Sequence, residues 1–212
     1  MNILAMALFS MIMSITPGPI NIVTLNSGLN YGFRQTMPYV SGATFGFTLL
    51  LLILGMGLSS MIMAYPMMLR VISYIGTAYM FYMGYNIMMS KSSLDNQSEV
   101  NQAPQFLDGA LLQWSNPKAW MACLSGLSTF TSATSIMPLI TFVSIYFVIC
   151  YFCIGIWAAA GMKLKSILTG ERYMRWFTRL MGLLLIATSF YMGAYNSRGF
   201  SMAEIGNHFG RF

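Results

Sequence analysis

The organisation of this chain is decided by one short stretch near its start, Thr16-Pro17-Gly18-Pro19-Ile20-Asn21. No charged residue precedes Arg34, and a run of about 20 apolar residues is long enough to cross a bilayer as a helix. A proline inside a helix removes a backbone donor and clashes with the carbonyl four residues earlier, so the helix is predicted to break at this motif. Inside a membrane, freed backbone groups are tolerated only where protein buries them or a wet cavity solvates them. We therefore interpret the stretch as the wall of a polar pathway.

A second break of the same kind is predicted at Ser115-Asn116-Pro117-Lys118-Ala119, where Pro117 stands 100 residues after Pro17. A half-helix that starts at a break presents free N–H groups and a positive dipole end, which suit a carboxylate. Lys118 is the one full charge deep in a predicted span, and such residues usually face a bundle interior or a wet cavity. Alternatively, Lys118 pairs with carbonyls of a broken half-helix or extends to the membrane interface, and the prolines only kink the bundle. The residues predicted to bind substrate are Thr16, Pro17, Gly18, Pro19, Asn21, Asn116, Pro117 and Lys118.

The composition is that of an integral membrane protein. Only 8% of the 212 residues are charged and 57% are apolar, whereas roughly 25% of the residues in soluble globular proteins are charged. The net charge of +6 does not indicate nucleic-acid binding, because the 11 Lys and Arg residues are scattered and mostly stand at the ends of apolar runs. In those positions they act as topology signals, and the expected surroundings are membrane lipids.

An all-α fold with six membrane-spanning helices is predicted. The approximate ranges are 2–28 with the first break, 38–64 with Pro38 in its first turn, 70–90, 106–130 with the second break, 136–161 and 176–196. The predicted domains are a first three-helix repeat at 1–90, a polar linker at 91–105, a second three-helix repeat at 106–196 and a polar tail at 197–212.

The two halves resemble each other in sequence. Each begins with a helix broken by proline and ends with the string Phe-Tyr-Met-Gly, at residues 81–84 and 190–193. Because three spans per half reverse the direction in which the second half enters the bilayer, the halves are predicted to form an inverted repeat. The odd-numbered loops carry Arg34, Lys91 and the basic segment 163–179, so the positive-inside rule places them in the cytoplasm and both termini outside.

Other reactive side chains have simpler interpretations. Asp108 is a candidate proton carrier or ammonium partner, but it stands ten residues before Lys118, about 15 Å along a straight helix, and is also suited to cap a helix. Cys150 and Cys153 have the spacing of a thiol-exchange or soft-metal motif, yet they lie in an apolar run, where thiols pack as small apolar groups. The sole histidine, His208, lies in the tail. No metal, cofactor, disulfide or catalytic constellation is predicted.

Taken together, the motifs resemble those of the LysE/RhtB superfamily of bacterial amino-acid exporters. They are Thr-Pro-Gly-Pro at 16–19, the glycines Gly32, Gly42 and Gly46, the segment 79–84, and Phe106-Leu107-Asp108-Gly109 leading into Asn116-Pro117-Lys118-Ala119. Their order and spacing agree over the chain up to about residue 196. That family often has two consecutive asparagines after this motif. This chain has Ile20 at the first of these positions, so only Asn21 matches the pair.

The resemblance implies a six-helix protein of the bacterial inner membrane that exports amino acids or close derivatives, is driven by the proton motive force and is not an enzyme. Because no buried acid is expected in the site, a neutral substrate of the threonine, homoserine or cysteine type is favoured. Gly42 and Gly46 form a small-residue face that lets a neighbouring helix come close, which is compatible with a homodimer. The alternatives are a membrane enzyme or thiol relay and a membrane assembly protein without transport activity.

Overall fold

The computed structural model describes residues 2–58, 66–89, 103–131, 135–167 and 171–197, and in these ranges the chain is helical with no strand. A five-residue π-helical segment, η1 (Leu54–Leu58), continues the third helix. The predicted all-α fold is confirmed for this part of the chain. The helices are α1 (Ile3–Ile15), α2 (Pro19–Tyr31), α3 (Phe33–Ile53), α5 (Pro66–Met89), α6 (Phe106–Trp114), α7 (Pro117–Phe130), α8 (Met137–Ile167) and α9 (Glu171–Ser197).

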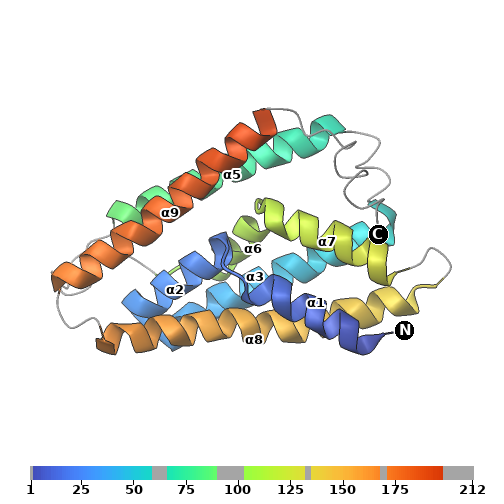
Figure 1. The fold of residues 1–212 in the computed structure, drawn as a ribbon, viewed down its shortest axis with the longest axis horizontal. Helices are drawn as coiled ribbons and strands as arrows, with labels where there is room; N and C mark the ends of the chain where they lie inside the picture. The colour runs from blue at the N-terminus through green and yellow to red at the C-terminus, as the bar shows by residue number, and fades with distance from the viewer. Residues whose placement is uncertain (1, 59–65, 90–102, 132–134, 168–170, 198–212) are drawn as a thin grey trace.

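The helices form a bundle with a distinct pair on one side (Figure 1). α1 and α2 both lie along α8, and α3 packs against α8 and α6. α5 and α9 run side by side and form the pair at the top of the view. The N-terminus lies at the opposite end of the molecule from the last turn of α8.

Both predicted helix breaks are present. α1 ends at Ile15 and α2 begins at Pro19, and the two axes are bent by 61°. α6 ends at Trp114 and α7 begins at Pro117, with Asn116 in an extended conformation as its N-cap. Each proline therefore stands at the first position of a helix, where its missing N–H would have had no helical partner. The breaks follow directly from the local chemistry of the two motifs.

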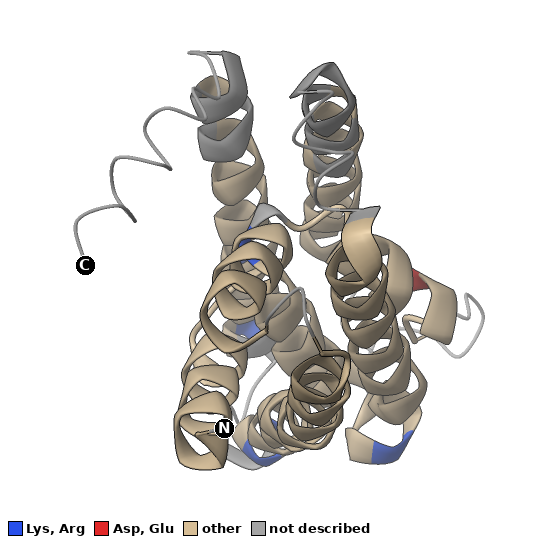
Figure 2. Ribbon diagram, turned by 90° about the vertical axis from the view of Figure 1, so that its right-hand side faces the viewer, with Lys and Arg blue, Asp and Glu red and all other residues tan. Residues whose placement is uncertain are grey.

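Two described helices, within Phe33–Gly57 and Met137–Lys165, are long and apolar enough to cross a membrane. The bent pair α1 and α2 is a third candidate if it counts as one span. The other described helices fall below the same test. Four of them carry charged residues: Arg70 in α5, Asp108 in α6, Lys118 in α7, and several residues at the start of α9. Figure 2 shows how few charged residues the described helices carry otherwise. Length and composition thus identify two or three of the six predicted spans.

The second predicted helix starts earlier than expected. α3 begins at Phe33, so the prediction that Pro38 lies in the first turn is wrong, and this proline lies inside the helix. The boundary is set by Gly32, whose φ of 82° is readily adopted only by a residue without a Cβ. A proline is tolerated in a helix interior where packing offsets the lost hydrogen bond. The position of Pro38 in the sequence therefore did not define where α3 begins.

Several predictions concern segments outside the described residues. These are the end of the second helix at 59–64, Lys91 with most of the polar linker at 91–102, and the tail at 198–212 with His208. Where the last two helices are described, their bounds are wider than predicted, since α8 extends to Ile167 and α9 begins at Glu171.

Glycines allow α3 and α6 to pack at backbone distance. A Cβ on Gly42 would overlap the carbonyl of Phe106, and a Cβ on Gly46 would lie 2.8 Å from Ala110 Cα. The small-residue face predicted at these two glycines is therefore used inside the chain, against α6. Close approach of this kind is typical of helix packing in membranes, where small residues line the contact.

The contact between α2 and α8 is equally close. A Cβ on Gly28 would overlap the carbonyl of Ala158, and a Cβ on Gly161 would overlap the carbonyl of Leu25. Because backbone atoms cannot move aside as a flexible side chain can, the two helices are held at a fixed distance along this contact.

Candidate functional site

The two helix breaks meet through Lys118. This residue is the second of α7, and its Nζ donates hydrogen bonds to the backbone oxygen and to the hydroxyl oxygen of Thr16, both at 2.7 Å. Gly18 lies directly beside it, since a Cβ there would be 3.3 Å from Lys118 Cδ. The ammonium group of the second motif therefore caps the carbonyl that the first motif frees. Residues 102 positions apart in the chain are joined at this point.

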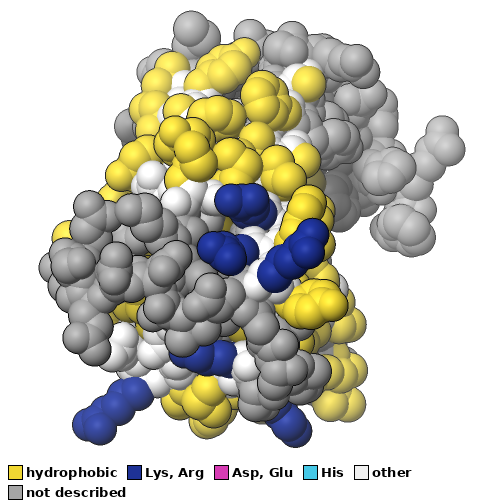
Figure 3. All heavy atoms as spheres, turned by 90° about the vertical axis from the view of Figure 1, so that its left-hand side faces the viewer, with side chains coloured by type: hydrophobic (Ala, Val, Ile, Leu, Met, Phe, Trp, Pro, Cys, Tyr) yellow, Lys and Arg dark blue, Asp and Glu magenta, His cyan; other side chains and the backbone are white. Residues whose placement is uncertain are grey.

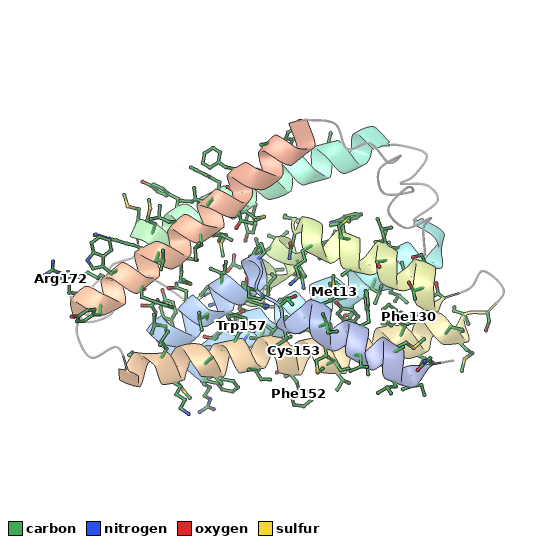
Figure 4. The ribbon with its side chains drawn as sticks, viewed as in Figure 1. Met13, Phe130, Phe152, Cys153, Trp157 and Arg172 are labelled. Atoms are coloured by element: carbon green, nitrogen blue, oxygen red, sulfur yellow. The ribbon has the colours of Figure 1, made fainter. Side chains whose placement is uncertain are left out.

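Side chains also satisfy the other carbonyls at the first break. Asn21 Nδ2 donates to the backbone oxygens of Ser14 at 3.0 Å and of Thr16 at 2.7 Å. Trp157 on α8 donates from Nε1 to the backbone oxygen of Ile15 at 3.1 Å (Figure 4). An unpaired backbone group inside a membrane costs several kcal/mol, so these three hydrogen bonds stabilise the broken helix in an apolar surrounding.

The second break is stabilised in the same way. Asn116 accepts a hydrogen bond from the backbone N–H of Lys118 at 3.1 Å, and its Nδ2 donates to Gln113 Oε1 at 3.3 Å. Trp120 Nε1 donates to the backbone oxygen of Trp114 at 2.7 Å. The last carbonyl of α6 and the first amides of α7 therefore have protein partners at this break.

A small cavity of about 40 Å³ lies between the two breaks and α8. A buried water needs roughly 10–15 Å³ on the same measure, so about three waters fit and an amino acid does not. The polar lining residues of the cavity are Ser14, Asn21, Gln113, Asn116, Lys118, Tyr146 and Cys150, and no Asp or Glu of the described ranges lines it.

Most of the predicted site residues come together here. Gly18, Asn21, Asn116 and Lys118 line the cavity, and Thr16 binds Lys118. The three prolines flank these residues: Pro17 is exposed, Pro19 opens α2 and is buried, and Pro117 opens α7.

Asp108 does not join this cavity. It forms a capping box at the start of α6, where its Oδ2 accepts from the Gln105 backbone N–H at 2.8 Å. Its Oδ1 accepts from the Tyr79 hydroxyl on α5 at 3.4 Å. The helix-cap interpretation of Asp108 therefore has a direct structural basis, and no residue of the cavity lining contacts its carboxylate in the interactions described.

Four polar lining residues were not predicted from the sequence: Ser14, Gln113, Tyr146 and Cys150. Gln113 carried a usable signal, because it is a polar residue in an apolar helix three positions before Asn116. Tyr146 and Cys150 carried none, because they reach the cavity from α8, and the register of α8 against α1 depends on tertiary packing. Cys150 and Cys153 are both free thiols, and no group of three or more metal-binding side chains occurs among the described residues.

Two broken helices that meet at a small polar cavity within an apolar bundle are typical of membrane transporters. The family description that matches this chain is "LysE type translocator", and it covers residues 11–195. The chain belongs to that family.

Similar proteins of described function are efflux proteins. The Cysteine/O-acetylserine efflux protein of Escherichia coli (strain K12) is 29% identical over 188 residues, which are 84% of this chain and 90% of that protein. The proteins of the same description from Escherichia coli O1:K1 / APEC and from Shigella flexneri serotype 5b (strain 8401) are 29% identical over 187 and 188 residues, with the same coverage. No solved structure matches the chain.

Replacing Asn21 by leucine is expected to lower the stability of the protein. The substitution keeps the approximate size but removes two hydrogen bonds and leaves buried carbonyls with fewer donors, which costs about 1–3 kcal/mol. The thermal unfolding midpoint of the purified protein in detergent measures the loss. The matched control is Asn30→Leu, because Asn30 Nδ2 bonds within its own helix to Asn26. Equal losses in the two variants would contradict this role of Asn21.

Proposed function

We propose that this protein is a multi-pass secondary exporter of small neutral amino acids in the bacterial inner membrane. The observation that carries the proposal is the pair of 2.7 Å hydrogen bonds from Lys118 Nζ to Thr16, which puts an ammonium group at the wall of a cavity between two helix breaks. The family membership and the efflux proteins to which the chain is similar support the same function.

The ammonium group of Lys118 is proposed to bind the substrate carboxylate. In this structure Nζ uses neutral partners, the carbonyl and hydroxyl of Thr16. A hydrogen bond between two charged groups is roughly twice as strong as one between neutral groups, so an entering carboxylate would displace Thr16 as the partner. Binding would then release the contact between the two motifs, which couples occupancy of the cavity to its shape.

A neutral substrate suits the rest of the lining. The polar residues around the cavity are amides, hydroxyls, a thiol and Lys118, and no carboxylate is among them. The amide oxygens of Asn21 and Gln113 supply acceptors for a substrate ammonium group. A substrate with an additional positive charge would meet Lys118 without a compensating acid, which disfavours lysine and arginine.

The arrangement of α3 and α8 supports the proposal of inverted repeats. The prolines Pro17 and Pro117 define an offset of 100 residues, and under this offset Phe47 corresponds to Phe147. The ring of Phe47 stacks on that of the adjacent Tyr146, with centroids 4.3 Å apart. Around a two-fold axis, equivalent residues lie nearest to each other where the paired helices cross. A contact between corresponding positions of α3 and α8 is what a two-fold axis between the repeats would produce.

The pair α5 and α9 gives independent support. The matching strings Phe-Tyr-Met-Gly begin at Phe81 and Phe190, and the rings of these two residues lie 5.8 Å apart. The contact of Lys118 with Thr16 also joins equivalent motifs. Three pairs of elements thus meet at corresponding positions, and we infer six spans in two inverted three-helix repeats, 1–90 and 106–196, joined by the linker 91–105.

The charge distribution supports an orientation in the membrane. Figure 3 shows Lys and Arg side chains gathered at the end of the molecule where α3 begins, α8 ends and α9 begins. By the positive-inside rule this end is cytoplasmic, and the N-terminus, at the other end in Figure 1, is outside. The basic residues of these helix ends are Arg34, Lys163, Lys165, Arg172, Arg175 and Arg179.

Proton coupling is part of the proposal, with Asp108 as the candidate carrier. Asp108 and Glu171 are the acidic residues in the described ranges, and Glu171 stands at the first position of α9. Asp108 links α6 to α5 through Tyr79, so its protonation would weaken a contact between the central bundle and the pair α5 and α9.

Overexpression of the protein in bacteria is expected to raise the extracellular concentrations of small neutral amino acids and derivatives such as cysteine, O-acetylserine, serine, threonine or homoserine. Mass spectrometry of the medium measures the accumulation against an empty-vector strain, and lysine and arginine serve as negative controls. Abundant protein in the membrane without accumulation of any compound in the panel would favour the assembly or thiol-relay alternatives.

A further inference from the structure

One buried hydroxyl in the cavity wall has no well-aligned hydrogen-bond partner. Ser14 is 8% exposed and lines the cavity, and its Oγ lacks a partner of good geometry. A serine inside a helix normally bonds back to the carbonyl four residues earlier, as Ser10 does to Met6 at 2.7 Å. At Ser14 this does not occur, although both serines stand on α1, one turn apart. Buried polar groups are rarely left unpaired, so this hydroxyl requires an explanation.

Two further polar groups lie beside Ser14, both contributed by α8. The Tyr146 hydroxyl and the Cys150 thiol lie next to the Ser14 hydroxyl and interact with it weakly, without the geometry of a full hydrogen bond, and both residues are 2% exposed. Tyr146 is held in place by stacking on Phe47, with the ring centroids 4.3 Å apart. Both residues line the same cavity as Lys118. One wall of the cavity therefore offers a hydroxyl, a phenol and a thiol, within reach of the ammonium group that is proposed to bind a carboxylate.

We propose that Ser14, Tyr146 and Cys150 form a subsite for the side chain of the substrate, and that it selects small amino acids with an oxygen or sulfur atom on the β-carbon. The inference rests on the proposed export function and adds a selectivity to it. A carboxylate at Lys118 would leave the α-carbon between Lys118 and this wall, and the cavity must widen to admit it, so a short side chain needs the least widening. There a hydroxyl, thiol or ester oxygen would pair with Ser14, whereas a methyl group of the same size would leave that hydroxyl unpaired.

This subsite predicts discrimination between near-isosteric substrates. A site built to hydrogen-bond a substrate group strongly rejects an analogue that lacks the group, whereas an apolar pocket tolerates both. Serine and cysteine differ from 2-aminobutyrate only in that a methyl group replaces the hydroxyl or thiol. We expect the wild-type protein to prefer serine and cysteine over 2-aminobutyrate by about tenfold, which corresponds to about 1.4 kcal/mol.

The test is counterflow exchange of labelled serine, cysteine and 2-aminobutyrate by the purified protein in liposomes, which needs no proton gradient. The measured quantity is the ratio of exchange rates, because this ratio does not depend on the amount of active protein. Ser14→Ala is expected to bring the ratio of serine to 2-aminobutyrate close to one, mainly by slowing serine. Ser14→Thr, which retains a hydroxyl, is expected to keep the preference.

Ser10→Ala is the matched control. Ser10 is a buried serine of the same helix whose hydroxyl is already bonded to Met6, so the preference should remain about tenfold. An unchanged preference in Ser14→Ala, or equal exchange of serine and 2-aminobutyrate by the wild type, would overturn the subsite alone. Absence of exchange of every compound by the wild type would overturn the proposed function and the subsite with it.

Discussion

Export is expected to fall about 10- to 150-fold when Lys118 is replaced by methionine, with normal insertion of the protein into the membrane. Methionine fills a similar volume but cannot bind a carboxylate, and a hydrogen bond to a charged group contributes about 1.5–3 kcal/mol. The break at Thr16 should persist, because Asn21 Nδ2 still donates to the same backbone oxygen at 2.7 Å. The loss should therefore appear in transport and not in folding. Extracellular accumulation, normalised to the protein in the membrane fraction, measures it.

Lys165→Met is the control for this variant. Lys165 is exposed near the end of α8 and lies outside the cavity, so its replacement removes the same charge without touching the site. Export by this variant should remain within about twofold of the wild type, as surface substitutions usually have small effects. If Lys118→Met exports as well as Lys165→Met does, the ammonium group is only a structural cap, and the proposed carboxylate site does not exist.

Replacing Gly161 by leucine is expected to separate α2 from α8 and to destabilise the protein by roughly 3 kcal/mol, the upper end of the usual cost of overpacking. A Cβ at this position would overlap the backbone oxygen of Leu25, and backbone cannot be moved without shifting α2. Because α2 carries Asn21, the shift would also disturb the first break. Thermal unfolding in detergent and export in cells should both decline.

Gly155→Leu on the same helix provides the comparison. Gly155 stands six residues before Gly161, and a Cβ there would have no atom within 4 Å. The same change in side-chain volume and in backbone freedom is thus made at an open position. A loss of stability as large as that of Gly161→Leu would mean that the close contact with Leu25 is not responsible.

The helix breaks could be predicted from the sequence because their cause is local. Pro19 and Pro117 disfavour the continuation of a helix from the preceding residues but can begin one, so residue type made the ends of α1 and α6 expected, although Pro38 shows that a proline can also lie inside a helix. The convergence of the two motifs was also predictable in outline, from the matching positions of the breaks in the two halves. The hydrogen bonds from Lys118 to Thr16 supply the detail that the pattern could not.

The rest of the site depends on tertiary packing. Tyr146 and Cys150 lie in a continuous apolar helix in which every side is compatible with lipid, so no periodicity indicates which residues face the cavity. Trp157 likewise gave no sign that its indole caps the broken helix. Asp108 is the opposite case: its place before the second motif made it a candidate for chemistry from the sequence, and the structure adds that its carboxylate caps α6 and contacts Tyr79, away from the cavity.

The tryptophans at the breaks make the site visible to fluorescence spectroscopy. The chain has four tryptophans. The indole of Trp157 donates a hydrogen bond at the first break, and the indole of Trp120 donates one to the backbone oxygen of Trp114 at the second. Indole emission depends on the hydrogen bonding and polarity around the ring, so a rearrangement of either break alters the intrinsic emission of the unlabelled protein. The donors that stabilise the interrupted helices thus also serve as built-in optical reporters of their movement.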